Sequence, residues 1–153
     1  MSNLQGLNLG QNALQYLHSG VFSGLSQLQQ LSLDTNRLYV LESGVFSDLS
    51  SLEHLSMRQN NIYVVPRGIF SSQSKLSDLL LQRSFMSWYA DYLRDLFDGL
   101  INLQVLVLNS NYLTNLLWPT ILSFKGLHNL EYLDLGSNSL TALPSLEGAL
   151  PRT

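Results

Sequence analysis

One pattern, L-x-x-L-x-L-x-x-N-x-L, runs through almost the whole chain of 153 residues. Its copies begin at residues 4, 28, 52, 76, 103 and 130, so the first three intervals are 24 residues and the last two are 27. The pentapeptide SGVFS occurs at 19–23 and again at 43–47, and RGIFS follows at 67–71 with the same spacing. A period of this length indicates stacked coils, in which each unit buries its apolar side chains against its neighbours. The chain is therefore predicted to form a solenoid.

Each copy of the pattern predicts a short strand, because leucines at alternate positions share one face of an extended chain. In the second copy, Leu31 and Leu33 are expected to point inward and Ser32 outward. Stacking then forms a parallel sheet whose outward residues lie in columns about 5 Å apart. The predicted columns are Gly6, Gln30, His54, Asp78, Val105 and Tyr132; Asn8, Ser32, Ser56, Leu80, Val107 and Asp134; and Gly10, Asp34, Arg58, Gln82, Asn109 and Gly136.

Two further columns have a predicted structural role. An amide side chain both donates and accepts, so an asparagine after each strand can satisfy backbone groups where the chain turns inward. A phenylalanine late in each unit can fill the side of the coil opposite the sheet, and the glycine before it allows the bend. The asparagines are Asn12, Asn36, Asn60, Asn111 and Asn138, and the phenylalanines are Phe22, Phe46, Phe70, Phe97 and Phe124.

The fourth copy departs from the pattern. Ser84 stands where the other copies have asparagine, and three extra residues follow. Apolar residues spaced by three and four predict a short amphipathic helix opposite the sheet; they are Tyr89, Tyr92, Leu93, Leu96, Phe97 and Leu100. The change in coil width marks residues 84–100 as a candidate for something other than scaffold.

The full template, with asparagine after the strand and phenylalanine late in the unit, resembles the typical leucine-rich repeat of extracellular receptors. The SGVFSGL and SGVFSDL coils are similar to those of toll-like receptor ectodomains and, less closely, of variable lymphocyte receptors. The resemblance implies an α/β leucine-rich repeat solenoid, a right-handed β-α superhelix with a curved parallel sheet on its concave face. Short helices or irregular coils would form the convex face. Residues 1–153 would make a single domain of about six repeats.

Such receptors normally carry cysteine-rich caps, whereas this chain contains no cysteine. Leucines at both ends of the solenoid are then expected to be uncovered, which makes self-association through the ends a possible partner mode. The resemblance implies an extracellular or receptor-ectodomain location. The sequence shows no export signal at its start, so a cytoplasmic location stays open.

Composition narrows the function classes. A net charge of −3 with eight lysines and arginines disfavours a generic nucleic-acid surface, and no apolar run is long enough to span a bilayer. The histidines His18, His54 and His128 fall in different repeats, so we expect no metal site, and no glycine-rich loop indicates a nucleotide or other cofactor. Ser56, His54 and Asp78 come together on neighbouring strands, but an open strand offers no oxyanion donors, and we expect no enzyme activity.

The columns predict a charged group of candidate ligand-binding residues. Asp34 neighbours Arg58, and His54 neighbours Asp78. An imidazole beside a carboxylate holds its proton more readily, so a pH-sensitive contact is one interpretation. The alternative is two solvated lateral pairs that contribute little.

The same columns predict an apolar candidate surface. Leu80, Val105, Val107 and Tyr132 occupy outward positions where a regular repeat has polar residues, and exposed apolar patches often mark partner sites. A loop covering the patch is the alternative. Trp88, in the fourth unit, is a further candidate anchor, although an inserted tryptophan more often covers its own coil.

Two functional hypotheses follow. The resemblance implies a non-catalytic recognition module that binds a protein or microbial ligand, as innate immune pattern-recognition receptors do. The alternative is a structural or oligomerising segment, or an intracellular protein-interaction scaffold. Fold alone does not choose between them.

Overall fold

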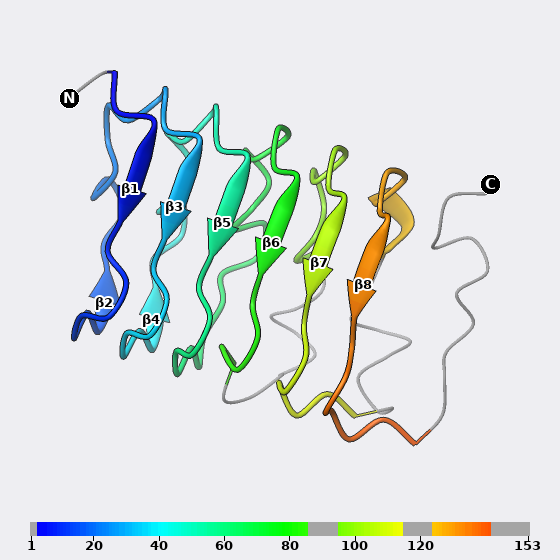
Figure 1. Ribbon diagram of the computed structural model, residues 1–153. Helices are drawn as coiled ribbons and strands as arrows, with labels where there is room; N and C mark the ends of the chain where they lie inside the picture. Colours follow the sequence, from blue (N-terminus) through cyan, green and yellow to red (C-terminus); the bar gives the residue numbers. More distant parts are fainter. Residues whose placement is uncertain (1–2, 86–94, 115–123, 142–153) are drawn as a thin grey trace.

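The computed structural model describes residues 3–85, 95–114 and 124–141. Its main element is a six-stranded parallel sheet in which the strands stand in chain order (Figure 1). The strands are β1 (Gly6–Asn8), β3 (Gln30–Ser32), β5 (His54–Ser56), β6 (Asp78–Leu80), β7 (Val105–Val107) and β8 (Tyr132–Asp134). Each coil therefore lies against the coil before it, and the predicted parallel-sheet solenoid is confirmed. We number the coils one to six by the strands in this order.

The strand register agrees with the predicted columns. Gly6, Gln30 and His54 are Cα partners in turn, and the same column continues through Asp78, Val105 and Tyr132. The central leucine of each strand points inward; Leu31, Leu55, Leu79 and Leu106 are all at most 2% exposed. Residues on either side of that leucine form the outer surface of the sheet, which we call the sheet face.

The asparagine column closes the coils by hydrogen bonding. The Asn60 amide donates to the carbonyl oxygens of Leu33 (3.0 Å) and Met57 (2.9 Å), and its oxygen accepts the N–H of Leu38 at 3.2 Å. Asn36, Asn111 and Asn138 repeat this arrangement. Each side chain therefore ties its own turn to the preceding coil, as the sequence predicts.

Phenylalanines fill the side of the solenoid opposite the sheet. All five are at most 3% exposed, and Phe22, Phe46 and Phe70 stack with ring centroids 6.2 and 5.9 Å apart. Phe97 and Phe124 stack at 6.0 Å. The glycine two residues before each of the first three rings has a positive φ, between 61° and 78°, which explains the conserved spacing of the SGVFS turn.

The helices of the β-α superhelix that the resemblance implies are not confirmed on the side opposite the sheet. In the described residues it consists of turns and one 3₁₀ helix, Phe124–Gly126. Irregular coils were one of the two expected arrangements, and the turns fit them. The helix predicted across Tyr89, Tyr92 and Leu93 lies outside the described residues, whereas Leu96, Phe97 and Leu100 are buried in a turn region.

A smaller two-stranded parallel sheet lies beside the main one. It contains β2 (Tyr16–Leu17) and β4 (Val40–Leu41), and an isolated bridge from Val40 to Val64 extends the pairing to coil three (Figure 1). The leucine pattern did not predict this sheet, because its residues follow the part of each unit from which the strands were predicted.

In coil four the chain turns into the core one residue earlier than in the other coils. Ser84 donates through its hydroxyl to the Met57 carbonyl at 2.7 Å, and its own carbonyl accepts the N–H of Ile62 at 2.8 Å. Phe85 then pairs with Ile62 and is buried, whereas the residue that follows asparagine in other coils is exposed, as at Asn61 and Tyr112. Phe85 therefore occupies the core position that Leu38 and Leu113 occupy in their coils.

Candidate functional site

The N-terminal half of the sheet face centres on the carboxylate of Asp34. One oxygen accepts the Ser56 hydroxyl at 2.5 Å and the Arg58 backbone N–H at 2.8 Å. The other accepts Nε and Nη2 of Arg58 at 2.9 and 2.7 Å. Four hydrogen bonds to one carboxylate orient the guanidinium more firmly than a solvated lateral pair would.

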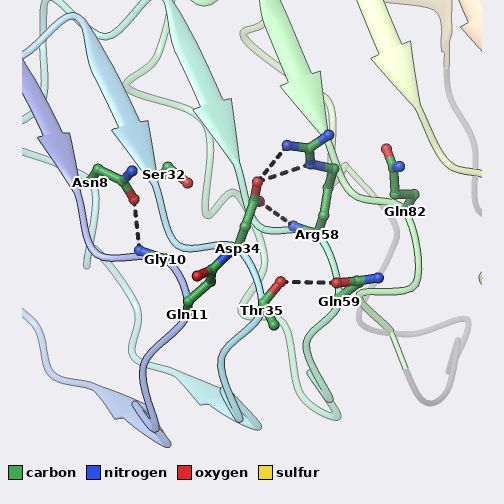
Figure 2. A pocket seen from close by; sticks show the side chains of 9 residues that line it. All are labelled: Asn8, Gly10, Gln11, Ser32, Asp34, Thr35, Arg58, Gln59 and Gln82. Carbon is green, nitrogen blue, oxygen red and sulfur yellow. Dashed lines mark hydrogen bonds and ion pairs between the residues drawn. The ribbon is translucent and has the colours of Figure 1, made fainter.

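A polar hollow of about 500 Å³ surrounds this ion pair. Figure 2 shows the Arg58 guanidinium turned toward Asp34, with Gln82 on the far side and the Thr35 hydroxyl donating to Gln59 at 2.9 Å. The lining residues are Asn8, Gly10, Gln11, Ser32, Asp34, Thr35, Arg58, Gln59 and Gln82. The Asp34 carboxylate is 16% exposed and the Arg58 side chain is 43% exposed, so a ligand meets mainly the cation.

His54 and Asp78 lie one strand further along and form the second predicted pair. Nδ1 of His54 is hydrogen-bonded to a carboxylate oxygen of Asp78. The Ser77 hydroxyl donates to the same oxygen at 3.0 Å. The carboxylate is thus fixed from two sides, and the imidazole, which is 46% exposed, is held at the surface.

The C-terminal half of the sheet face is apolar. Leu80 pairs with Val107, and Val105 stands between Asp78 and Tyr132 in the register. Leu80, Val105 and Val107 are half-buried, and the Tyr132 side chain is 54% exposed. The four residues therefore form one continuous surface, which we call the apolar patch.

A second hollow of about 500 Å³ joins the two halves. Its lining includes His54, Asp78 and Leu80, and Gly6 leaves it open at the N-terminal end, since no atom lies within 4 Å of where a Gly6 Cβ would stand. The remaining lining residues are Leu7, Asn8, Gln30, Leu31, Ser32, Leu55 and Ser56. This arrangement offers apolar contact beside a histidine–carboxylate pair, which suits binding of an amphipathic surface.

The structure separates the serine of the rejected catalytic arrangement from its histidine. The Ser56 hydroxyl donates to Asp34, while His54 pairs with Asp78, so no proton relay connects Ser56 to His54. Within residues 3–85, 95–114 and 124–141, no three histidine, aspartate or glutamate side chains come close enough to hold a metal ion. Trp88, the remaining candidate, lies outside the described residues.

One titratable cluster was missed by the sequence patterns. The Glu42 carboxylate accepts the Tyr16 hydroxyl at 2.5 Å and the Ser19 N–H at 2.6 Å. These hydrogen bonds, that from Tyr16 first, lower the pKa of Glu42 from 4.5 to about 2, and the same contact raises the pKa of Tyr16. The sequence did hold a signal for this contact: Tyr16 and Glu42 are separated by one 24-residue period plus two residues, which places them on neighbouring coils.

The part of the chain that the structure describes contains no helix long and apolar enough to cross a membrane.

Comparison with protein-family models identifies the repeat. A model described as "Leucine rich repeat" matches residues 1–38 and 27–84, and a second model, "Leucine Rich Repeat", matches residues 129–149. Together these matches cover more than half of the chain. Comparison with curated protein sequences found no match.

Solved structures with the same fold include three leucine-rich repeat proteins. The matching protein chain in the structure of the TLR13–ssRNA13 complex has 28% sequence identity to this chain over 97% of its length, with a TM-score of 0.69. Human 5T4, also called Wnt-activated inhibitory factor 1 or trophoblast glycoprotein, is 26% identical over 97% with a TM-score of 0.75. The leucine-rich repeat domain of APL1B is 22% identical over 93% with a TM-score of 0.70, a likeness of fold alone. The chain spans only 24%, 58% and 40% of these three chains, respectively.

Proposed function

This chain belongs to the leucine-rich repeat family, and on that premise we propose that it is a non-catalytic recognition module whose sheet face binds a protein or microbial ligand. The observation that carries the proposal is the continuous surface formed by the apolar patch and the His54–Asp78 pair. Apolar side chains in outward positions of a strand contribute little to their own coil, whereas they can exclude water from an interface.

The two halves of the sheet face would contribute differently to binding. Tyr132 is the candidate anchor, because exposed tyrosines supply large contact area at low conformational cost. Arg58, held in place by Asp34, would offer its exposed guanidinium edge to an acidic or carbonyl-rich part of the ligand. His54, held at the surface by Asp78, would add a polar contact beside the apolar patch.

The resemblance to toll-like receptor segments supports an extracellular or receptor-ectodomain location and a role in innate immune recognition. TLR13 is bound to single-stranded RNA in its solved complex. For this chain, the net charge of −3 and the apolar patch favour a protein ligand over a nucleic acid. An intracellular scaffold would use the same surface.

The test is a binding screen of the folded chain against secreted and microbial surface proteins on a sensor, followed by variants. Leu80→Asp and Tyr132→Ala should each abolish saturable binding while leaving circular dichroism unchanged. Ile101→Asp is the matched control, because Ile101 is 53% exposed and lies outside the sheet face. Binding that survives Leu80→Asp and Tyr132→Ala would move recognition away from the sheet face.

A structural or oligomerising role is the second candidate, and one observation favours it. β1 pairs on one side only, and Leu4, Leu7, Leu9 and Leu14 of coil one are only partly buried. Leucines left open at the end of a stack can be covered by another coil. Sedimentation equilibrium separates the candidates: association that strengthens with concentration and is unaffected by Leu80→Asp supports the second, and a folded monomer with a saturable ligand supports the first.

A further inference from the structure

A third hollow, of about 490 Å³, lies just beyond the last residues of the sheet columns, where the chain leaves the sheet. It is lined by Asn60, Asn61, Arg83, Phe85, Ser110, Tyr112 and Ser137, which belong to coils three to six. None of the ligand-binding candidates on the sheet face is among them.

The shift in coil four explains why the hollow exists. In neighbouring coils, the residue that follows the asparagine position is exposed, as at Asn61 and Tyr112. Phe85 holds this position in coil four, yet it is only 2% exposed, because it fills the core beside Ile62. One side chain is therefore missing from the row between Asn61 and Tyr112, and Phe85 lines the space that it leaves.

The lining of this hollow is cationic, and several of its polar side chains have no hydrogen-bond partner among the described residues. Across the described residues, the side chains of Arg83, Asn61, Ser110 and Ser137 make no hydrogen bond or ion pair, and no carboxylate lines the hollow. Arg83 thus differs from Arg58, whose guanidinium is engaged by Asp34. At the position of Arg83, the other coils carry the uncharged residues Gln11, Thr35, Gln59, Ser110 and Ser137.

The chemistry of these groups specifies an anion with a ring attached. A free guanidinium binds phosphate and sulfate oxygens with paired N–H donors, and serine hydroxyls can donate to the remaining oxygens. Tyr112, which is 67% exposed, presents a ring on which a flat group can stack. The volume falls within the range of about 300 to 1,000 Å³ that is usual for small-ligand pockets.

We propose that the hollow formed by Arg83, Ser110, Ser137 and Tyr112 binds a phosphate or sulfate monoester carried on a ring. Arg83 holds the anionic group, Ser110 and Ser137 donate to it, and Tyr112 stacks on the ring. This site is separate from the sheet face, so it gives the recognition module a second, small-molecule specificity that does not depend on the first.

The test is a titration of the folded chain with phenyl phosphate and phenyl sulfate, observed by saturation-transfer NMR of the ligand. Two control ligands are titrated in the same way. Inorganic phosphate lacks the ring, and phenyl β-glucoside lacks the charge. The variants are Arg83→Gln and Tyr112→Ala, with Arg37→Gln as control, since Arg37 is an exposed arginine of coil two. Arg83→Gln introduces the residue that coils one and three already hold at this position with the same positive φ, so folding should be retained.

The proposal expects saturable binding of at least one phenyl ester, weakened about tenfold by Arg83→Gln and about fivefold by Tyr112→Ala, and unchanged by Arg37→Gln and Leu80→Asp. Tighter binding of phenyl phosphate assigns the site to phosphate esters, and tighter binding of phenyl sulfate assigns it to sulfate esters. The absence of saturable binding would overturn the proposal, as would equal weakening by Arg83→Gln and Arg37→Gln. Inorganic phosphate or the neutral glucoside binding as tightly as the esters would also overturn it.

Discussion

The two halves of the sheet face share one backbone arrangement and carry opposite chemistry. In the N-terminal half, Asp34, Ser56 and Arg58 satisfy one another through hydrogen bonds across neighbouring coils. In the C-terminal half, Leu80 and Val107 meet at the same register with no polar group between them. The inward leucines are equally buried in both halves, so the surface can change without any change in the core. The comparison shows that the core and the chemistry of the sheet face are set by alternate positions of the same strands.

The coils also differ in how they are closed. Coil three uses hydrogen bonds of the Asn60 side chain, whereas coil four uses a serine hydroxyl, a backbone carbonyl and an inserted ring. The regular closure gives a uniform edge, and the irregular closure leaves the hollow beside Arg83. Variants in the two regions should therefore separate what each closure contributes.

The largest expected effect is on the regular closure. Asn60→Ala removes three hydrogen bonds in a buried region and leaves the Leu38 N–H without a partner, so at about 1 kcal/mol for each bond the free energy of unfolding should fall by about 3 kcal/mol. Ser84→Ala removes mainly the bond to the Met57 carbonyl and should cost about 1 kcal/mol. Urea unfolding monitored by circular dichroism measures both. Equal losses would show that coils three and four are closed equally tightly.

A second pair of variants compares the turns opposite the sheet. Gly99 has a φ of 89°, and a Cβ there would lie 2.9 Å from the Ser71 carbonyl oxygen; Gly24 has a φ of 77° and open space around it. A left-handed backbone costs about 1 kcal/mol for either alanine, and the contact adds about another 1 kcal/mol for Gly99→Ala. The melting temperature of Gly99→Ala should therefore be lower than that of Gly24→Ala. The reverse order would mean that the coil-four turn adjusts freely.

A smaller effect is expected from the surface groups themselves. Asp34→Asn should lower the free energy of unfolding by about 1 kcal/mol, near the upper end for exposed ion pairs because of the paired geometry. Val107→Thr, in the other half, should change it by about 0.5 kcal/mol or less. A double-mutant cycle of Asp34→Asn with Arg58→Gln isolates the pair. A coupling indistinguishable from zero would show that the ion pair orients Arg58 without stabilising the fold.

The smallest expected effect is a dependence of stability on pH that arises from residues of the first two coils. Because the pKa of Glu42 is lowered to about 2, its charged form favours the folded state. The sign follows from linkage: this stabilisation is complete above about pH 4.5, the usual pKa, and is lost as the pH falls toward 2. Tyr16→Phe should weaken the dependence, since the Tyr16 hydroxyl is the main cause of the shift. Melting temperatures measured from pH 2 to 6 provide the check, and identical profiles for the two proteins would contradict it.

Much of the scaffold could be predicted from the sequence, because the period of the leucines determines which residues meet. Asp34 and Arg58 are neighbours in the structure, and Leu80 pairs with Val107, as the predicted columns had placed them. The asparagine closure followed from the chemistry of an amide beside unpaired backbone groups. The positions that make these contacts repeat with the period of the leucines, so one period is enough to reveal which residues become neighbours.

What escaped prediction involves contacts between non-equivalent positions. Ser56 reaches Asp34 from the adjacent column, and Tyr16 reaches Glu42 across a period and two residues. The replacement of asparagine by Ser84 was visible, but its consequence, the inward turn of Phe85, depends on the core space beside Ile62. A repeat template treats such residues as variable, and only three-dimensional packing assigns them partners.

The uniform contacts between the first coils have a consequence for how such a chain can evolve. Coil two meets coil one through the Asn36 side chain and the stacking of Phe46 on Phe22, and it meets coil three through the equivalent Asn60 and Phe70. Its two junctions are therefore interchangeable, so a genetic duplication or deletion of 24 residues would join surfaces that already fit. Coil four lacks this property, because its closure by Ser84 and Phe85 matches no other junction. The solenoid can thus change length by whole coils on the N-terminal side of coil four, whereas the junction made by Ser84 and Phe85 has no equivalent with which to exchange.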